Sequence, residues 1–508
     1  MTETYETPHG FQRWMMVFAA VLGSAVFDLT WVIVGVALPY MQGTFSATPD
    51  QMAWVMVSFI VGGTMMTAVT GWASTRFGRK QLFIIALLAN MVATMMCGLA
   101  DSLMSEVFWR FIQGVFSAPL LAIGQGLAID AFPSHKRSFA TGIWSASTVG
   151  AVVIAPLVGG YMVEHISWRW VFFISVPMAG LAALCAYMFV PNSKPEPGRR
   201  IEWIGFSALI TTVGSLQLAL SRGERLDWFD SHEIVAYCVI ALISAIVVVI
   251  RTVLVTESFL DKRLFVDRNF VVSTNIMILF GGLVTLPMIL MPLMLQQVNG
   301  YPAISAGALI LPRGLGLVVA SLVVGQLGRT DPRMILAFGF VCTAVTNLYA
   351  ASWTVDIDQW AVIWTNFAHG IAAGSIFVPM VSIALATLNR RLHTEALTFM
   401  FLLLNIGKAL GVAGIFVVYT RVLQTNHWVL SEYITTTNER LRQIEMPQSW
   451  DMATQPGLAS IAAEIGRQAE LIAYLNAFLI IGIAAAAVVP LLAFLKRPPL
   501  EGTSEEPT

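Results

Sequence analysis

The chain has 508 residues, of which 57% are hydrophobic and only 12% are charged, and its formal net charge at pH 7 is −1. Soluble domains carry about 25% charged residues, so this composition excludes an ordinary soluble protein. The balanced charge provides no basic surface for nucleic acid. The cysteines lie in apolar stretches without metal-ligand spacing, so we expect neither a metal site nor a disulfide framework. They are Cys97, Cys185, Cys238 and Cys342.

Apolar stretches follow one another along the whole chain. Each is roughly 20 to 28 residues long, enough to cross a ~30 Å hydrocarbon core as a helix. We therefore expect an all-α integral membrane protein with 14 transmembrane helices. The predicted spans are 14–38, 52–72, 81–100, 106–129, 139–161, 168–190, 201–221, 233–255, 270–295, 303–326, 334–353, 360–388, 396–420 and 471–495.

Lysine and arginine concentrate on every second connection between the predicted spans. Basic connections remain on the cytoplasmic side of a membrane, so we expect both termini in the cytoplasm. The opposite short connections contain only Arg222 and Arg225. The basic residues that set this orientation are Arg13, Arg76, Arg79, Lys80, Lys136, Arg137, Lys194, Arg199, Arg200, Arg251, Lys262, Arg263, Arg268, Arg329, Arg333, Arg390, Arg391, Lys496 and Arg497.

Two connections are long. Residues 191–200 form a Pro-rich, basic linker, and residues 421–470 are expected to form a long polar loop on the periplasmic side. Within that loop, 431–442 and 458–469 have the pattern of short amphipathic helices. The expected parts of the chain are an N-terminal six-helix bundle at 1–190, the linker with two inserted transmembrane helices at 191–268, a C-terminal six-helix bundle at 269–495 and a tail at 496–508.

The two halves of the chain resemble each other. WRFIQG at 109–114 corresponds to TNFAHG at 365–370, and the connection from Gly71 to Arg79 corresponds to that from Gly325 to Arg333. An offset of about 255 residues indicates a duplicated six-span unit, which places a substrate path between the halves near the bilayer midplane. The spans 201–221 and 233–255 have no counterpart, so we interpret them as an inserted pair.

Several motifs resemble those of the major facilitator superfamily. GWASTRFGRK at 71–80 is similar to its signature connection, although Thr75 stands in the usual aspartate position. WRFIQG and APLVGG (155–160) resemble the fourth-span and fifth-span motifs of its proton antiporters. SWRWVFFISVP (167–177) and GSLQLALSRGERLDWF (214–229) resemble the fourteen-span EmrB-type exporters. The residues that we assign to structural or gating motifs are Gly71, Arg76, Gly78, Arg79, Lys80, Pro156, Gly159 and Gly160.

The resemblance implies a major facilitator fold of six, two and six helices. It also implies proton-driven efflux of hydrophobic or amphipathic compounds across a bacterial inner membrane, powered by the proton gradient without a cofactor. EmrB-type exporters work with a periplasmic membrane-fusion adaptor and an outer-membrane channel. The alternatives are a dedicated exporter of a metabolite, siderophore or fatty acid, and a substrate:proton symporter. Motifs of membrane-embedded enzymes are absent from the sequence, so we expect no catalytic residues.

Charged residues inside a membrane are expensive and mark functional sites. Proton coupling needs a group that gains and loses a proton in a partly dry cavity. Asp28 lies within the first span, two residues away from the family's aspartate position. Glu106 precedes Arg110 by one helical turn on the same face. The alternative interpretation is that Glu106 is an interfacial carboxylate near water. The candidate proton-coupling and transport residues are Asp28, Glu106, Arg110, Gln113, His369, Arg313, Asn405 and Lys408.

Overall fold

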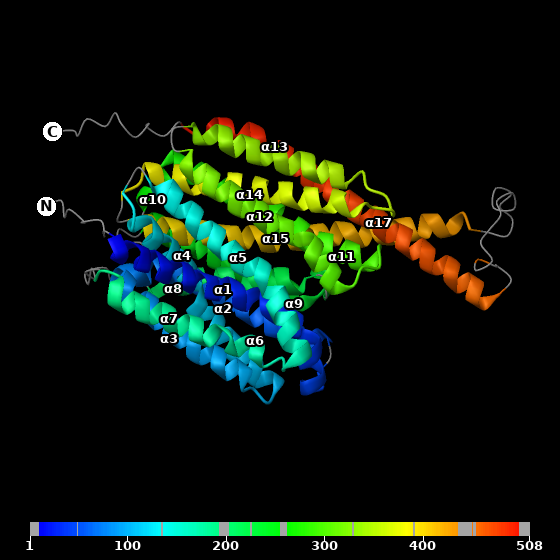
Figure 1. Cartoon of the computed structure of the whole chain (residues 1–508), viewed down its shortest axis with the longest axis horizontal. Coiled ribbons are helices and arrows are strands. Elements are labelled where there is room, and N and C mark those ends of the chain that lie inside the picture. Colours follow the sequence, from blue (N-terminus) through cyan, green and yellow to red (C-terminus); the bar gives the residue numbers. More distant parts are fainter. Residues whose placement is uncertain are drawn as a thin grey trace.

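The computed structural model describes residues 10–47, 49–133, 136–192, 203–223, 226–254, 262–327, 330–389, 392–434, 450 and 454–496. Most of the predicted linker 191–200, most of 431–442 and nearly all of the predicted tail 496–508 lie outside these residues. The regular structure of the described chain is helical (Figure 1). The helices that build the bundle are α1 (Gly10–Phe45), α2 (Pro49–Phe77), α3 (Arg79–Gly98), α4 (Leu103–Asp130), α5 (Arg137–His165), α6 (Trp170–Phe173), α7 (Ser175–Phe189), α8 (Trp203–Arg222), α9 (His232–Leu254), α10 (Lys262–Val266), α11 (Arg268–Gln297), α12 (Ala303–Gln326), α13 (Pro332–Ala350), α14 (Gln359–Ala386), α15 (His393–Glu432) and α17 (Gln455–Val488). Two short 3₁₀ helices are η3 (Trp228–Asp230) and η6 (Val489–Phe494).

Thirteen stretches of the described residues are long and apolar enough to cross a membrane. The predicted fifth span, 139–161, is the 29-residue helix α5, which packs against α1 and α12 inside the bundle. Each predicted span therefore lies on a helix, as a fourteen-span protein requires. The span predicted at 168–190 is divided near Ile174 into α6 and α7.

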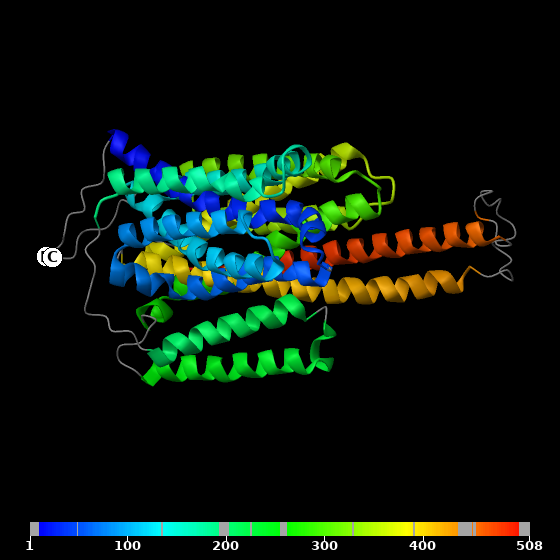
Figure 2. The same cartoon turned by 90° about the horizontal axis from the view of Figure 1, so that it is seen from below.

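The inserted pair α8 and α9 lies on the outside of the bundle (Figure 2). α8 packs against α2 and α15, one helix from each half. Arg222 at the end of α8 forms an ion pair with Glu233 of α9 and lies 4.6 Å from the centre of the Trp54 ring on α2. Few residues of α9 are buried, which is the arrangement of a helix that faces lipid.

The prediction of a long loop at 421–470 is wrong for most of its length. α15 continues for 40 residues to Glu432, and α17 begins at Gln455, so the two helices project together beyond the bundle (Figures 1 and 2). No glycine or proline interrupts the chain between Ile415 and Ile434, so nothing in the sequence stops the helix where hydropathy falls. The helix predicted at 458–469 is part of α17. We call the projecting parts of α15 and α17 the distal hairpin.

Glycines bring the helices of each half into backbone contact. In the first half, α2 and α4 meet where Gly62 faces the carbonyl of Phe111, and in the second half Gly316 of α12 faces the carbonyl of Phe367 of α14 in the same way. A Cβ atom at either glycine would collide with that carbonyl oxygen. Small residues are what allow such close crossings between helices in a membrane.

The two halves meet at one end of the bundle. α1 starts and η6 finishes at this end, which we call the terminal end, and the distal hairpin marks the other (Figure 1). Near the terminal end, Gly142 of α5 lies against the carbonyl of Ser321 on α12, and a Cβ atom at Gly71 of α2 would lie 3.1 Å from the Cα atom of Glu395 on α15. These contacts close the space between the halves on that side.

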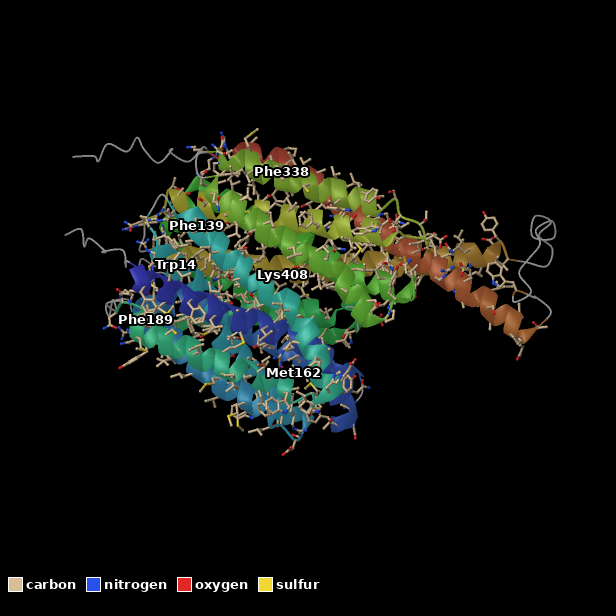
Figure 3. All side chains as sticks on the ribbon, viewed as in Figure 1. Trp14, Phe139, Met162, Phe189, Phe338 and Lys408 are labelled. Carbon is tan, nitrogen blue, oxygen red and sulfur yellow. The ribbon has the colours of Figure 1, made fainter. Side chains whose placement is uncertain are left out.

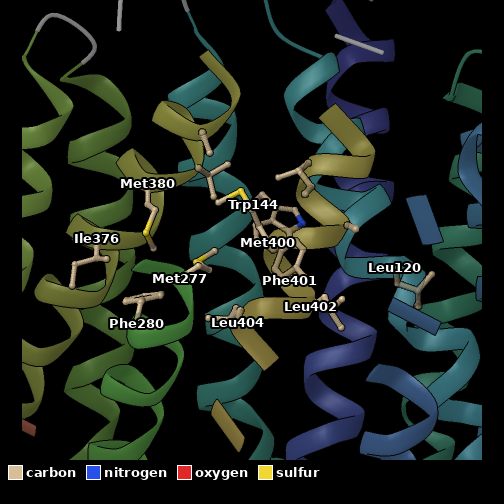
Figure 4. Packing of buried hydrophobic residues seen from close by; sticks show 14 of the residues in the cluster. Leu120, Trp144, Met277, Phe280, Ile376, Met380, Met400, Phe401, Leu402 and Leu404 are labelled. Atoms are coloured by element: carbon tan, nitrogen blue, oxygen red, sulfur yellow. The ribbon is translucent and has the colours of Figure 1, made fainter. Parts of the chain in front are cut away.

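An apolar plug lies just inside these contacts. The Trp144 ring of α5 stacks 6.1 Å from Phe377 of α14 and packs 5.9 Å from Phe401 of α15 (Figure 4). The Trp144 indole N–H donates a hydrogen bond to the Ser24 hydroxyl at 2.9 Å, which fixes the ring to α1. The plug therefore joins both halves around one indole.

We predict that Gly316→Val destabilises the protein by about 1–3 kcal/mol, because a branched side chain there forces α12 away from the Phe367 carbonyl. The melting temperature of the purified protein in detergent measures the effect. Gly307→Val on the same helix is the matched control, because open space surrounds the Cβ position of Gly307. Equal melting temperatures for the two variants would show that the crossing has room for a side chain.

Candidate transport site

Arg110 is the most deeply enclosed charge of the first half. The Ser102 hydroxyl accepts from the Ser105 N–H at the start of α4, so the helix begins at Leu103 and Arg110 lies seven residues, or about 10 Å, further in. Its side chain is fully buried. Its Nε donates to the Val55 carbonyl at 3.2 Å, and its guanidinium lies 4.4 Å from the centre of the Phe59 ring.

Gln113 connects Arg110 to α3. Arg110 Nη1 donates to Gln113 Oε1 at 2.6 Å, and Gln113 Nε2 donates to the Thr94 hydroxyl at 2.6 Å. The Cys97 thiol lies 3.9 Å from the same Oε1. Thr94 and Cys97 were not predicted as site residues, although their spacing of three residues on one face of a predicted span was a usable signal. α2, α3 and α4 thus hold the guanidinium in one orientation.

Glu106 is a buried carboxyl group without hydrogen-bond partners. Its side chain is fully buried, and neither carboxylate oxygen accepts a hydrogen bond. The positive charges of Arg110 and Arg169 interact electrostatically with this carboxyl group. The alternative of an interfacial carboxylate near water does not describe this position. A carboxyl group that is buried without hydrogen bonds is costly when charged, which suits a group that exchanges a proton.

Asp28 and Lys408 interact across the two halves. Asp28 is half-buried on α1, and Lys408 is half-buried on α15. The two opposite charges interact electrostatically with each other. Lys408 lies near the middle of the bundle (Figure 3). Asn405 precedes it by three residues and shares its helix face. The displacement of Asp28 from the family position therefore leaves it close enough to the opposite half for this interaction.

Aromatic rings surround this region of the first half. Phe27 and Trp31 flank Asp28 on α1, and their rings lie 5.8 Å and 6.2 Å from the Phe59 ring. Both are only partly buried. One wall of the site thus combines an apolar surface with the Asp28 carboxylate.

Arg313 and His369 form a third cluster, on α12 and α14. Arg313 Nη2 donates to the Val284 carbonyl, and its Nη1 has no hydrogen-bond partner. The Nε2 atom of the buried His369 ring also lacks a partner, and the Arg313 charge acts on that ring. The candidate residues therefore gather in three groups: Glu106 with Arg110 and Gln113, Asp28 with Lys408, and Arg313 with His369.

The signature connection lies at the terminal end. Gly78 adopts φ 86°, a left-handed conformation that favours glycine, at the turn between α2 and α3. Arg79 then forms an ion pair with Asp130 at 2.6 Å. The Thr75 hydroxyl donates to the Trp72 carbonyl of its own helix. Arg76 is half-buried, and Lys80 lies 5.7 Å from the Tyr187 ring.

His393 lies where this connection meets the second half. Burial and the nearby Arg137 guanidinium lower the pKa of His393 to about 4. Asp130 and Arg79 also act on it, and its Nε2 lies 3.2 Å from the Leu388 carbonyl. At neutral pH the imidazole is therefore uncharged, and the charges at this end come from the arginines and carboxylates around it.

The fifth-span motif brings α5 against α1. A Cβ atom at Gly159 would lie 2.7 Å from Ile33 Cγ1, so only glycine permits this contact, whereas open space surrounds Gly160. Pro156 lies within the continuous helix α5, and its side chain lies outside the described residues. Within the described residues, no group of three His, Cys, Asp or Glu side chains is arranged to hold a metal ion.

Known transport proteins resemble this chain over most of its length. The chain is 29% identical over 472 residues to the multidrug export protein EmrB of Escherichia coli K12, covering 91% of both chains. It is 29% identical over 488 residues to the fatty acid resistance protein FarB of Neisseria gonorrhoeae, covering 94% of this chain and 95% of that protein. The crystal structure of the human organic anion transporter MFSD10 shares the fold, with a TM-score of 0.59 at 12% identity, over 94% of this chain and 100% of that one.

The family model of the Major Facilitator Superfamily matches residues 20–412. The predicted superfamily and helical fold are confirmed, and the family consists of transporters rather than enzymes. This chain is a multi-pass membrane protein that belongs to the major facilitator superfamily.

Proposed function

We propose that the protein is a proton-driven exporter of hydrophobic and amphipathic compounds across a bacterial inner membrane, with both termini in the cytoplasm. The observation that carries this proposal is Glu106, a fully buried carboxyl group without hydrogen-bond partners beside Arg110. Such a pair exchanges a proton inside a dry helix bundle. The names of the similar proteins, for multidrug export and for fatty acid resistance, support the outward direction.

The proposed cycle uses the closed terminal end as its starting state. Protons from the periplasm reach Glu106, which lies three residues after the distal start of α4, and Asp28. Protonation removes the negative charges that act on Arg110 and Lys408, and this weakens the attraction between the halves at Asp28. The halves then reopen around the Trp144 plug toward the cytoplasm, where both protons are lost and a new substrate binds.

A dedicated exporter on the same scaffold is the second candidate, and the similarity to FarB over 94% of this chain favours it. The partly buried rings of Phe27 and Trp31 suit the apolar body of either kind of substrate. The fifth-span motif, which the exporters of the superfamily share, argues against an importing symporter.

We further propose that the distal hairpin docks a periplasmic adaptor, the partner of EmrB-type exporters. A groove of about 410 Å³ opens between α15 and α17 and is lined by Leu423, Gln424, His427, Trp428, Ser431, Gly466 and Glu470. Trp428 is 66% exposed and Leu458 is 51% exposed, far beyond the bundle. Exposed aromatic and apolar side chains at a projecting groove are typical of a protein interface.

The first prediction concerns Arg110. Arg110→Ala should reduce gradient-driven efflux to the rate of protein-free vesicles, because the Glu106 carboxyl loses its neighbouring cation. Arg110→Lys should not restore it, since one ammonium cannot reach the Val55 carbonyl and Gln113 with the geometry of a planar guanidinium. Dye efflux from proteoliposomes measures both, with detergent gel filtration as the control for folding. Normal transport by the alanine variant contradicts the proposal.

The second prediction concerns the two carboxyl groups. Glu106→Gln and Asp28→Asn should each flatten the pH dependence of transport, and the double variant should abolish it, because each removes one proton-carrying group. Transport rates across a series of pH values in proteoliposomes measure this. Glu470→Gln, on the distal hairpin, is the matched control. A wild-type pH profile in the double variant would assign proton coupling to another group, with His369 the next candidate.

The third prediction concerns the distal hairpin. Ser431 and Gly466 line the same groove, so a short Gly/Ser linker can replace residues 431–465 without separating the helices. The shortened protein should bind substrate in detergent like the wild type and should co-purify less adaptor, because it loses the exposed Leu458 and the end of the groove at Ser431. Cellular resistance should fall in parallel. Trp428→Ser tests the same surface at full length. Unchanged co-purification of both variants would place the docking surface elsewhere.

A further inference from the structure

The backbone register of the two halves identifies equivalent positions. Gly114 of α4 touches the carbonyl of Phe59 on α2, and Gly370 of α14 touches the carbonyl of Arg313 on α12. Together with the Gly62 and Gly316 contacts, these crossings form the same pattern of glycine-to-carbonyl contacts in each half. Arg313 therefore occupies the position of Phe59, and Asn366 occupies the position of Arg110.

The buried cation lies on different helices in the two halves. In the first half, Arg110 on α4 lies over the Phe59 ring of α2. In the second half, α12 supplies the cation as Arg313, and the equivalent of Arg110 is the neutral Asn366, whose Nδ2 donates to the Val362 carbonyl of its own helix at 3.0 Å. His369 stands in the place of Gln113. The second half thus has a cation at this crossing, but the residues equivalent to Arg110 and Gln113 are Asn366 and His369.

The second cation is incompletely bound. Arg110 donates to two acceptors and lies over an aromatic ring, and only its Nη2 has no partner, whereas Arg313 donates to the Val284 carbonyl alone and its Nη1 has no partner. Arg313 is only 9% exposed and His369 only 4%, so water does not freely solvate either side chain. Both lie ten residues from the distal starts of their helices, or about 15 Å deep, near the middle of a bilayer.

The second half also lacks the carboxylate that the first half contains. Glu106 lies one helical turn before Arg110, and the residue at the same place before Asn366 is the buried Val362. Within the described part of the chain, no carboxylate forms an ion pair with Arg313, and the guanidinium is affected by burial and not by a neighbouring charge. Two unpartnered nitrogens at this depth, one on a guanidinium and one on an imidazole, therefore face no anion of the protein.

We propose that Arg313 and His369 form an anion subsite that receives the carboxylate group of an amphipathic substrate. The subsite deepens the proposed export function, on which it rests, by naming the substrate class. A guanidinium offers a carboxylate two parallel hydrogen bonds, and charge-assisted bonds of this kind are the strong ones in proteins. The substrate supplies the negative charge that Glu106 supplies in the first half. Lys408 adds a further positive charge to the second half near the middle of the bundle.

Equilibrium binding to the purified full-length protein tests this without any proton gradient. The probes are decanoate and decanol, which share a chain length and differ in charge. The wild type should bind decanoate at least about tenfold more tightly, the effect of one charge-assisted hydrogen bond. Arg313→Gln should reduce the preference to within about twofold while decanol affinity is kept. Val362→Glu should fill the subsite with an internal carboxylate and abolish the preference, whereas the uncharged control Val362→Gln should retain it.

Equal affinity of the wild type for the two probes, or binding of neither, overturns the subsite. So does a decanoate preference that survives both Arg313→Gln and Val362→Glu. Displacement by lysophosphatidylglycerol with no effect of decanoate would assign the cluster to a lipid phosphate instead, and would also overturn the proposal. Efflux of a permanently cationic dye, which does not use the subsite, tests proton-driven export separately, so the two failures are distinguishable.

Discussion

Every polar group within the membrane-crossing part of this protein must find its partner inside the protein, because hydrocarbon offers none. That constraint organises the first half around Arg110. The helices approach through Gly62 and Gly114 until the Val55 carbonyl and the Gln113 amide reach the guanidinium. Thr94 then satisfies the other end of Gln113. Close packing and polar satisfaction are therefore one feature, since the glycine contacts set the distances over which these hydrogen bonds form.

The same constraint makes the exceptions informative. Glu106, Arg313 and His369 carry buried polar atoms without partners, as do Asn90, Gln125 and the Nη2 of Arg110, and an unmet polar group of this kind costs free energy. Glu106, Arg313 and His369 are ionisable groups in this set. Groups left in that state are suited to bind something that comes and goes. We propose two transient ligands, a proton at Glu106 and a substrate anion at Arg313. Asp28 and Lys408 place opposite charges on the two halves, and Lys408 lies near the middle of the bundle.

The sequence was sufficient for the helices and for the enclosed position of Arg110, because hydropathy and helical spacing are local properties. It was insufficient where tertiary contacts decide. The opposite charges of Asp28 and Lys408 face each other only because the two halves pack together, and no local pattern in the sequence reports that. The distal hairpin was mistaken for a loop because falling hydropathy marks where a helix leaves the membrane, not where it ends. The change of the cation from α4 to α12 became visible only once the backbone contacts of Gly114 and Gly370 aligned the two halves.

The direction of substrate movement in an imposed pH gradient tests the central claim most directly. Proteoliposomes with an acidic lumen are diluted into alkaline buffer that contains a permanently cationic dye, which does not follow a pH gradient by itself. An antiporter passes protons outward and carries the dye inward, so we expect dye to accumulate in the acidic lumen, and not in vesicles without protein. Accumulation in vesicles with an alkaline lumen instead, or the same uptake without any gradient, would contradict proton-driven export.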